Sequence, residues 1–254
     1  MKTEILYEDN SILVIRKPAG LAVQSAGIGQ ADVVSELKSH LAKLPGAGRP
    51  GKGEPYLGIV HRLDQPVEGL LVFAKDKKAA AALSKQLAEG ALNKHYYAVL
   101  CGYPDCPEGD LVDYLRKEGN VAVAVTGREQ EFADAKIAAL HYRILEEIND
   151  PSPLALADVT IGTGRFHQIR VQFAHAGFPL LGDTKYGTAA RKEAMPAQKY
   201  RGVALCAYSL ELVHPISGKK MGFRVVPKNP AFAGFAMEEL KKLTENETGI
   251  SKRG

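Results

Sequence analysis

The stretch from residue 58 to residue 75 constrains the fold most, because two apolar, strand-like runs flank a short charged turn there. The turn holds an imidazole, a guanidinium and a carboxylate within four residues, contributed by His61, Arg62 and Asp64. Apolar runs on both sides predict that the turn is anchored to a rigid sheet, and a reactive side chain needs rigid support. The same three side chains are also compatible with a simple salt bridge in a turn.

The remaining pattern predicts an α+β fold. Apolar or alternating runs predict strands at residues 5–7, 12–15, 94–100, 121–125, 138–148, 154–161, 203–213 and 221–226. Helical spacing predicts helices at residues 33–44, 77–92, 166–176 and 235–243. Regular βαβ alternation is absent, so we expect a mixed, mostly antiparallel sheet core with flanking helices. Residues 1–243 are expected to form one domain, and residues 244–254 a polar tail.

Composition narrows the class of protein only slightly. The net charge of +4 and a pI near 8.8 are compatible with a polyanionic partner without requiring one. Three cysteines without a CxxC pair favour a reducing cytoplasm, and no cysteine or histidine spacing indicates a metal site. No apolar run approaches the length of a membrane span and no signal peptide is visible, so we expect a cytoplasmic protein.

The His61–Asp64 turn permits two interpretations. In extended backbone, Arg62 and Asp64 point to one side while His61 and Leu63 point to the other. An exposed Arg–Asp pair of this kind is most often a surface salt bridge of small energy. The protein-kinase catalytic loop, which has His-Arg-Asp without an intervening residue, is excluded because Leu63 separates Arg62 from Asp64.

A second group of polar residues follows Gly162 and Gly164. The run Gly162-Thr-Gly-Arg-Phe-His-Gln-Ile-Arg170 opens a helix, but its sixth position is His167, so the dinucleotide-binding fingerprint is broken. His167 and Arg170 are three residues apart and are expected to share a helix face. That face suits a polyanion or a buried carboxylate, and a solvated basic face is an equal alternative.

A third group lies in the predicted strand at residues 94–100. Alternation places Tyr96 and Tyr97 on opposite faces of this strand, so we expect one ring in the core and the other at a cleft or in solvent. An aromatic ring at a cleft can stack on a nucleic-acid base.

Together with Lys17-Pro-Ala-Gly20, these motifs resemble, in order and content, the RluA-type family of RNA pseudouridine synthases, and the resemblance runs from about residue 5 to residue 226. It implies the pseudouridine synthase fold, with the catalytic domain alone and no added N-terminal RNA-binding domain. The implied roles of the matching residues are the following: Asp64 is the catalytic aspartate, Arg62 enters the space of the flipped nucleotide, Tyr96 stacks on the target base and assists proton removal, Arg170 pairs with Asp64, Arg165 and His167 lie near the RNA backbone, and His61 and Lys17 complete the substrate contacts.

The sequence departs from the family pattern at three places. Arg16 stands where the family commonly has Asn, Val67-Glu68 where it commonly has Thr-Ser, and Phe166 where it commonly has Thr. We expect these residues to lie near the site and to bear on which RNA is modified.

The resemblance implies an enzyme that isomerises specific uridines in rRNA or tRNA after base flipping, as a monomer and without cofactor or metal. Asp64 would act as a nucleophile on the sugar or the uracil ring, or as a base toward a sugar proton. Burial disfavours the charged carboxylate and a cation such as Arg170 restores it, which is a physical reason for an arginine in the last motif. The alternatives are a non-catalytic RNA-binding protein on the same scaffold, or a nucleotide-binding enzyme that uses Gly162 and Gly164.

Overall fold

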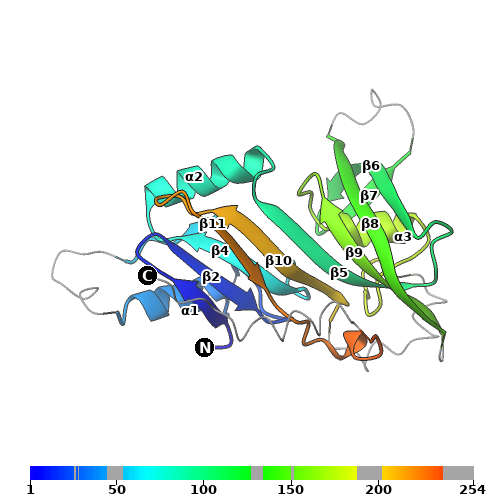
Figure 1. The fold of residues 1–254 in the computed structure, drawn as a ribbon, viewed down its shortest axis with the longest axis horizontal. Coiled ribbons are helices and arrows are strands. Elements are labelled where there is room, and N and C mark those ends of the chain that lie inside the picture. The colour runs from blue at the N-terminus through cyan, green and yellow to red at the C-terminus, as the bar shows by residue number, and fades with distance from the viewer. Residues whose placement is uncertain are drawn as a thin grey trace.

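The computed structural model describes residues 1–25, 27, 29–44, 54–126, 134–149, 152–187 and 202–236. In this part of the chain one 11-stranded sheet carries the helices on its faces (Figure 1). The strands are β1 (Glu4–Glu8), β2 (Ile12–Lys17), β3 (Gly58–Ile59), β4 (Glu68–Ala74), β5 (Asn93–Cys101), β6 (Glu108–Glu118), β7 (Val121–Val125), β8 (Lys136–Asn149), β9 (Pro153–Ile161), β10 (Leu205–Val213) and β11 (Lys220–Arg224). The helices are α1 (Val33–Leu41), α2 (Lys77–Ala88), α3 (Gln168–His175) and the short 3₁₀ helix η3 (Pro230–Phe232).

The strand order is β1-β2-β4-β10-β5-β9-β8-β6-β7, with β11 beside β10 and β3 beside β4. The β4–β10 pair is parallel and the other pairs are antiparallel. The predicted mixed, mostly antiparallel α+β fold is confirmed. None of the described helices is both long and apolar enough to cross a membrane.

The central strands of the sheet are buried on both faces. Along β4, Leu71 and Phe73 enter one core while Leu70 and Val72 enter another. Helix α1 covers the first face and α2 the second. Each helix begins at an aspartate, Asp32 or Asp76, whose side chain accepts a backbone N–H of the first turn.

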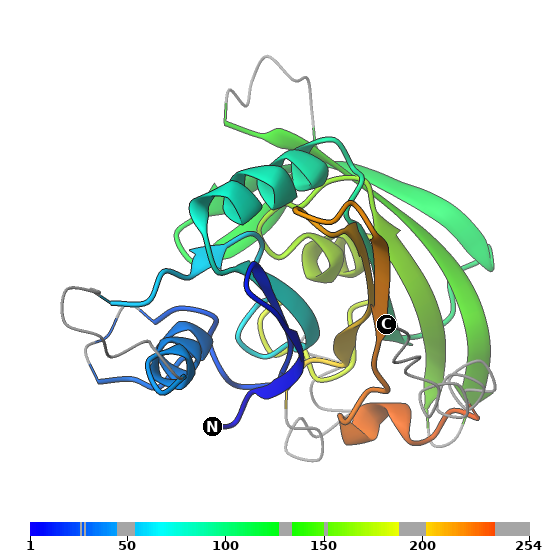
Figure 2. The same cartoon turned by 60° about the vertical axis from the view of Figure 1, so that its left-hand side comes forward.

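Helix α3 packs inside the half of the sheet made by β6, β7, β8 and β9. Figure 2 shows it end-on, on the concave side of these long strands. The curvature brings the N-terminal end of α3 toward the loop between β3 and β4, which carries the charged turn. The curved sheet therefore brings two segments that are distant in the sequence, the β3–β4 loop and the start of α3, into contact.

The structure differs from the sequence-based expectations at three points. Strand β6 (Glu108–Glu118) was not predicted, because it is rich in charged residues and becomes a strand only by pairing with β7 and β8. Helix α3 begins at Gln168, two residues later than predicted. Tyr96 and Tyr97 are both buried, at 5% and 1% exposure, because the sheet is covered on both faces. The predicted tail and residues 237–243 of the last predicted helix lie outside the described residues and stay predictions.

Candidate active site

Asp64 lies in the loop between β3 and β4, and buried neighbours fix this loop. His61 is 8% exposed, and its Nε2 accepts the backbone N–H of Val72 at 3.3 Å. Burial lowers the pKa of His61 to about 3, so the ring is neutral. Leu63 belongs to the core, whereas Arg62 is exposed and the Asp64 side chain is 23% exposed. The alternation predicted for the turn is thus present, and His61 serves the fold rather than facing solvent.

Lys17 ties the segment after β2 to the Asp64 loop. Its amine is fully buried and donates to the carbonyl oxygens of Pro18 at 3.0 Å, Leu21 at 2.7 Å and Gln65 at 3.0 Å. Three acceptors match the three donors of a protonated amine. Burial nevertheless lowers the pKa of Lys17 to about 7, although nearby carboxylates oppose the shift. Lys17 therefore supports the residue that follows Asp64, and its amine does not face solvent.

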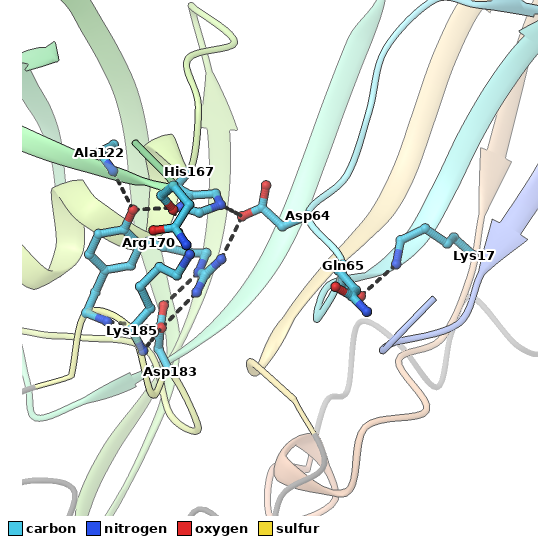
Figure 3. A network of polar contacts seen from close by, with 10 residues as sticks. Lys17, Asp64, Gln65, Ala122, His167, Arg170, Asp183 and Lys185 are labelled. Atoms are coloured by element: carbon cyan, nitrogen blue, oxygen red, sulfur yellow. Dashed lines mark hydrogen bonds and ion pairs between the residues drawn. The ribbon is translucent and has the colours of Figure 1, made fainter. Parts of the chain in front are cut away.

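Arg170 joins Asp64 to a second, fully buried carboxylate (Figure 3). Its Nη1 donates to Asp64 Oδ2 at 2.9 Å, while its Nε and Nη2 donate to Asp183 at 2.7 and 2.9 Å. Burial lowers the pKa of Arg170, but the hydrogen bonds and charges of Asp183 and Asp64 outweigh burial and raise it. The bidentate contact with Asp183 aims Nη1 of Arg170 at Asp64.

His167 also faces Asp64. Its Nε2 lies 3.7 Å from Asp64 Oδ2, and its Nδ1 lies 2.6 Å from the Tyr186 hydroxyl. The Phe166 ring stacks on the imidazole at a centroid distance of 3.8 Å. His167 was predicted to share a helix face with Arg170, but it occupies the N-cap position of α3, where its side chain makes no capping hydrogen bond. The side chains of His167 and Arg170 nevertheless converge on one carboxylate oxygen, Asp64 Oδ2. Within the described residues, Asp64 Oδ1 has no hydrogen-bond partner.

Tyr96 reaches the same site from β5. It is buried in the core of the Asp64 side of the sheet, and burial, followed by the charge of Asp64, raises its pKa. Its phenol therefore stays protonated at neutral pH. Such a group is suited to stacking or to donating a hydrogen bond, and it is a poor base for removing a proton.

The two remaining candidates for substrate contact, Arg62 and Arg165, are exposed. Arg62 makes no hydrogen bond or ion pair with any described residue. Arg165 donates from Nε to the Ile137 carbonyl at 2.9 Å, which holds its side chain along β8. Both guanidinium groups are accessible to a polyanion, in contrast to the buried cations Lys17 and Arg170.

Two residues of the site, Asp183 and Tyr186, were assigned no role from the sequence. Asp183 orients Arg170, and it also accepts the backbone N–H groups of Lys185 and Tyr186 at 3.0 and 3.2 Å. The Tyr186 ring lies under the Arg170 guanidinium at 5.2 Å. Their signal in the sequence is the run Gly182-Asp-Thr-Lys-Tyr-Gly187, which follows the predicted helix and was noted only as part of the resemblance.

The expectation that Arg16 and Glu68 lie beside the catalyst is corrected. They form an ion pair of 3.5 Å on the opposite face of the sheet from Asp64, next to the buried Cys206. Alternation along β2 and β4 sends neighbouring side chains to opposite faces, so nearness in sequence did not give nearness in space. Two of the departures do lie at the site: Val67 packs in the core on the Asp64 side and donates its backbone N–H to the Asp64 carbonyl at 3.1 Å, and Phe166 stacks on His167.

Comparisons with known proteins show which family this chain resembles. A family model described as RNA pseudouridylate synthase matches residues 11–175. The ribosomal large subunit pseudouridine synthase D of Zymomonas mobilis is 37% identical, over 87% of this chain and 68% of that protein. The protein of the same name from Vibrio cholerae is 32% identical, over 96% of this chain and 73% of its own. An uncharacterised RNA pseudouridine synthase of Synechocystis is 38% identical, and this chain spans 63% of its length.

A solved structure gives the same result for the fold. Human RNA Pseudouridylate Synthase Domain Containing 4 superposes with a TM-score of 0.67 at 25% identity, covering 89% of each chain. The region matched by the family model includes the Asp64 turn, Tyr96 and Arg170. The chain belongs to the RluA-type family of RNA pseudouridine synthases, which are isomerases that act on RNA.

Proposed function

We propose that this chain converts specific uridines of ribosomal RNA to pseudouridine, with Asp64 as the essential carboxylate. The observation that carries the proposal is the convergence of Arg170 and His167 on Asp64 Oδ2, while Oδ1 has no hydrogen-bond partner among the described residues and the site is partly exposed. A carboxylate anchored through one oxygen can react through the other without moving. The names of two relatives, which refer to the large ribosomal subunit, support ribosomal RNA as the substrate.

The proposed reaction needs no net oxidation or reduction. The bond between the ribose C1′ and uracil N1 breaks, the base turns, and C1′ bonds to C5 instead. The hydrogen on C5 then leaves to solvent and N1 gains a proton, so atoms and electrons balance. Asp64 Oδ1 serves as the nucleophile toward C1′ or the ring, or as the base toward a sugar proton. The chain's own residues supply this chemistry without a cofactor.

The target base has to leave the RNA stack before Asp64 can reach the reacting atoms. The exposed Arg62, which has no partner in the part of the chain that the structure describes, lies two residues before Asp64 and is the proposed occupant of the vacated gap, because a guanidinium stacks well on bases. Arg165 is the proposed contact to the RNA backbone. Tyr96 is proposed to stack on the flipped base as a neutral phenol. We further propose that the protein works as a monomer in the cytoplasm.

Release of tritium tests the proposal, because only the isomerase frees the hydrogen on C5. The substrate is RNA labelled with 5-tritiated uridine in cells that lack this protein. The Asp64→Asn variant should release no tritium while keeping its thermal midpoint and RNA affinity. The matched control is Asp110→Asn, which makes the same change at an exposed aspartate of β6 and should leave the rate intact. Release by Asp64→Asn, or RNA binding without release by the wild type, would refute the proposal, and the second result would indicate a non-catalytic RNA-binding protein.

A further inference from the structure

His167 has an unusual backbone for a residue of its type. Its φ is 54°, and among the described residues it is the one non-glycine residue with a positive φ. Backbone outliers of this kind persist where surrounding contacts enforce them, and they cluster at functional sites. A histidine at a position whose φ favours glycine indicates that its side chain has a role there.

The hydrogen bonds around Tyr186 determine which ring nitrogen of His167 carries the proton. The Tyr186 hydroxyl oxygen accepts the backbone N–H of Ala122 at 2.8 Å. The hydrogen of that hydroxyl then needs an acceptor, and His167 Nδ1, at 2.6 Å, is the acceptor available to it among the described residues. A neutral imidazole that accepts at Nδ1 carries its proton on Nε2. The Nε2–H group is the one that faces Asp64.

Other contacts hold the ring in this orientation. Phe166 stacks on one face with an interplanar angle of 22°, and the Tyr186 ring meets the imidazole edge at 82°. The side chain of His167 is 8% exposed. Burial lowers the pKa of His167 to about 4, Asp64 partly offsets the shift, and Arg170 and Lys185 add to it. The imidazole is therefore neutral at pH 7, as a defined tautomer requires.

We propose that His167 is a positioning residue, held by Tyr186 as the Nε2–H tautomer, and that this N–H and Arg170 together fix Asp64 Oδ2 so that Oδ1 is the reacting oxygen. The inference rests on the proposed catalytic role of Asp64. The distance of 3.7 Å from Nε2 to Oδ2 exceeds a hydrogen bond, and catalytic hydrogen bonds in unliganded enzymes often tighten only when substrate binds.

The tautomer is tested first, independently of activity. Nitrogen NMR spectra of the full chain, labelled at histidine, distinguish a protonated from an unprotonated ring nitrogen, and His167→Gln identifies the signal among the seven histidines. We expect a protonated Nε2 and an unprotonated Nδ1 at pH 7. Tyr186→Phe should produce a mixture of tautomers, whereas Tyr103→Phe, which removes a hydroxyl bonded to Ile148, should not. A protonated Nδ1 in the wild type, or an unchanged tautomer in Tyr186→Phe, would overturn the proposal.

A pair of substitutions then separates the Nε2 donor from the backbone role of His167. The amide of Gln places an N–H close to the position of Nε2, whereas the shorter Asn does not. Asn tolerates a positive φ better than Gln, so if His167 served only the backbone conformation, His167→Asn would be the more active variant. The proposal predicts the reverse for single-turnover tritium release. Asn should be slower than wild type by about 10- to 100-fold, the usual effect of one lost hydrogen bond to a charged group, and Gln by less than about tenfold.

RNA affinity should be similar in the two variants, because His167 is expected to act on Asp64 and not on the RNA backbone. An Asn variant as fast as the Gln variant, or faster, would refute the proposed donor. A wild-type protein that releases no tritium would refute the proposed function instead, and the NMR result would still decide the tautomer.

Discussion

A Glu68→Gln substitution should destabilise the fold without slowing catalysis. The Glu68 carboxylate is 4% exposed, and it accepts the backbone N–H groups of Lys228 and Asn229 at 2.8 to 3.1 Å in addition to its ion pair with Arg16. Gln keeps an oxygen for the two backbone groups but removes the charge. The Arg16 side chain, 10% exposed, then remains as a buried cation whose one other hydrogen-bond partner among the described residues is the Val226 carbonyl.

The expected magnitude follows from that burial. Removing one member of a buried ion pair typically costs about 3–5 kcal/mol, because the remaining charge is left uncompensated. The pair distance of 3.5 Å and the remaining contact of Arg16 with Val226 place the expected loss near the lower limit, at about 3 kcal/mol. The double variant Arg16→Met/Glu68→Gln should regain part of this loss, with a coupling energy of about 1–3 kcal/mol.

Urea denaturation of the wild type, both single variants and the double variant gives the four free energies of unfolding for the cycle. Tritium release, measured at a temperature at which all four proteins are folded, gives the rates. Glu68→Gln should keep the wild-type rate, because Glu68 lies on the opposite face of the sheet from Asp64. A loss below about 0.5 kcal/mol, or strictly additive effects, would show that the pair does not stabilise the fold. A slower rate with unchanged stability would show that Glu68 acts on the site after all.

Three further substitutions test the β4–β10 contact, the Arg170–Asp64 pair and the buried Lys17. Gly69→Ala should cost more than about 3 kcal/mol, measured by denaturation, because a Cβ would lie 2.4 Å from the Ala207 carbonyl oxygen at a φ of 128°; a stable variant would contradict the close β4–β10 approach. Arg170→Lys keeps the positive charge but loses the planar guanidinium that contacts Asp183 and Asp64 at the same time. Single-turnover rates should therefore fall by about 100-fold with little change in RNA affinity. Equal losses of rate and RNA affinity would indicate that Arg170 contacts the RNA instead. Lys17→Met should alter the pH dependence of stability, because the pKa of Lys17 is about 7 in the folded chain and 10.5 in the unfolded chain, so the unfolded chain binds more protons between these values. The free energy of unfolding of the wild type relative to the variant should therefore rise between pH 7 and 10.5, by at most about 1.4 kcal/mol per pH unit. A difference that does not change with pH would contradict the lowered pKa.

Local pattern predicted much of the fold, and it did so where the elements bury an apolar face. Helices α1 and α2 begin after Asp32 and Asp76, whose capping role depends only on neighbouring residues. Strand β6 escaped prediction because its charged residues carry little apolar periodicity, although one partner, β7, follows it directly in the chain and the other, β8, begins at Lys136. Propensity describes a segment alone, whereas β6 lies between β8 and β7 and is stabilised by pairing with both.

The sequence by itself determined the kind of residues in the site and the family, because motif order and local alternation are properties of the linear chain. The tertiary structure decided which of these residues meet. It brings Arg170 to Asp64 across 106 positions, adds Asp183 and Tyr186, and sends Glu68 to the opposite face of the sheet. The physical reason is that such contacts depend on strand order, register and the curvature of the sheet around α3, which are set by the whole chain together and not by any one segment.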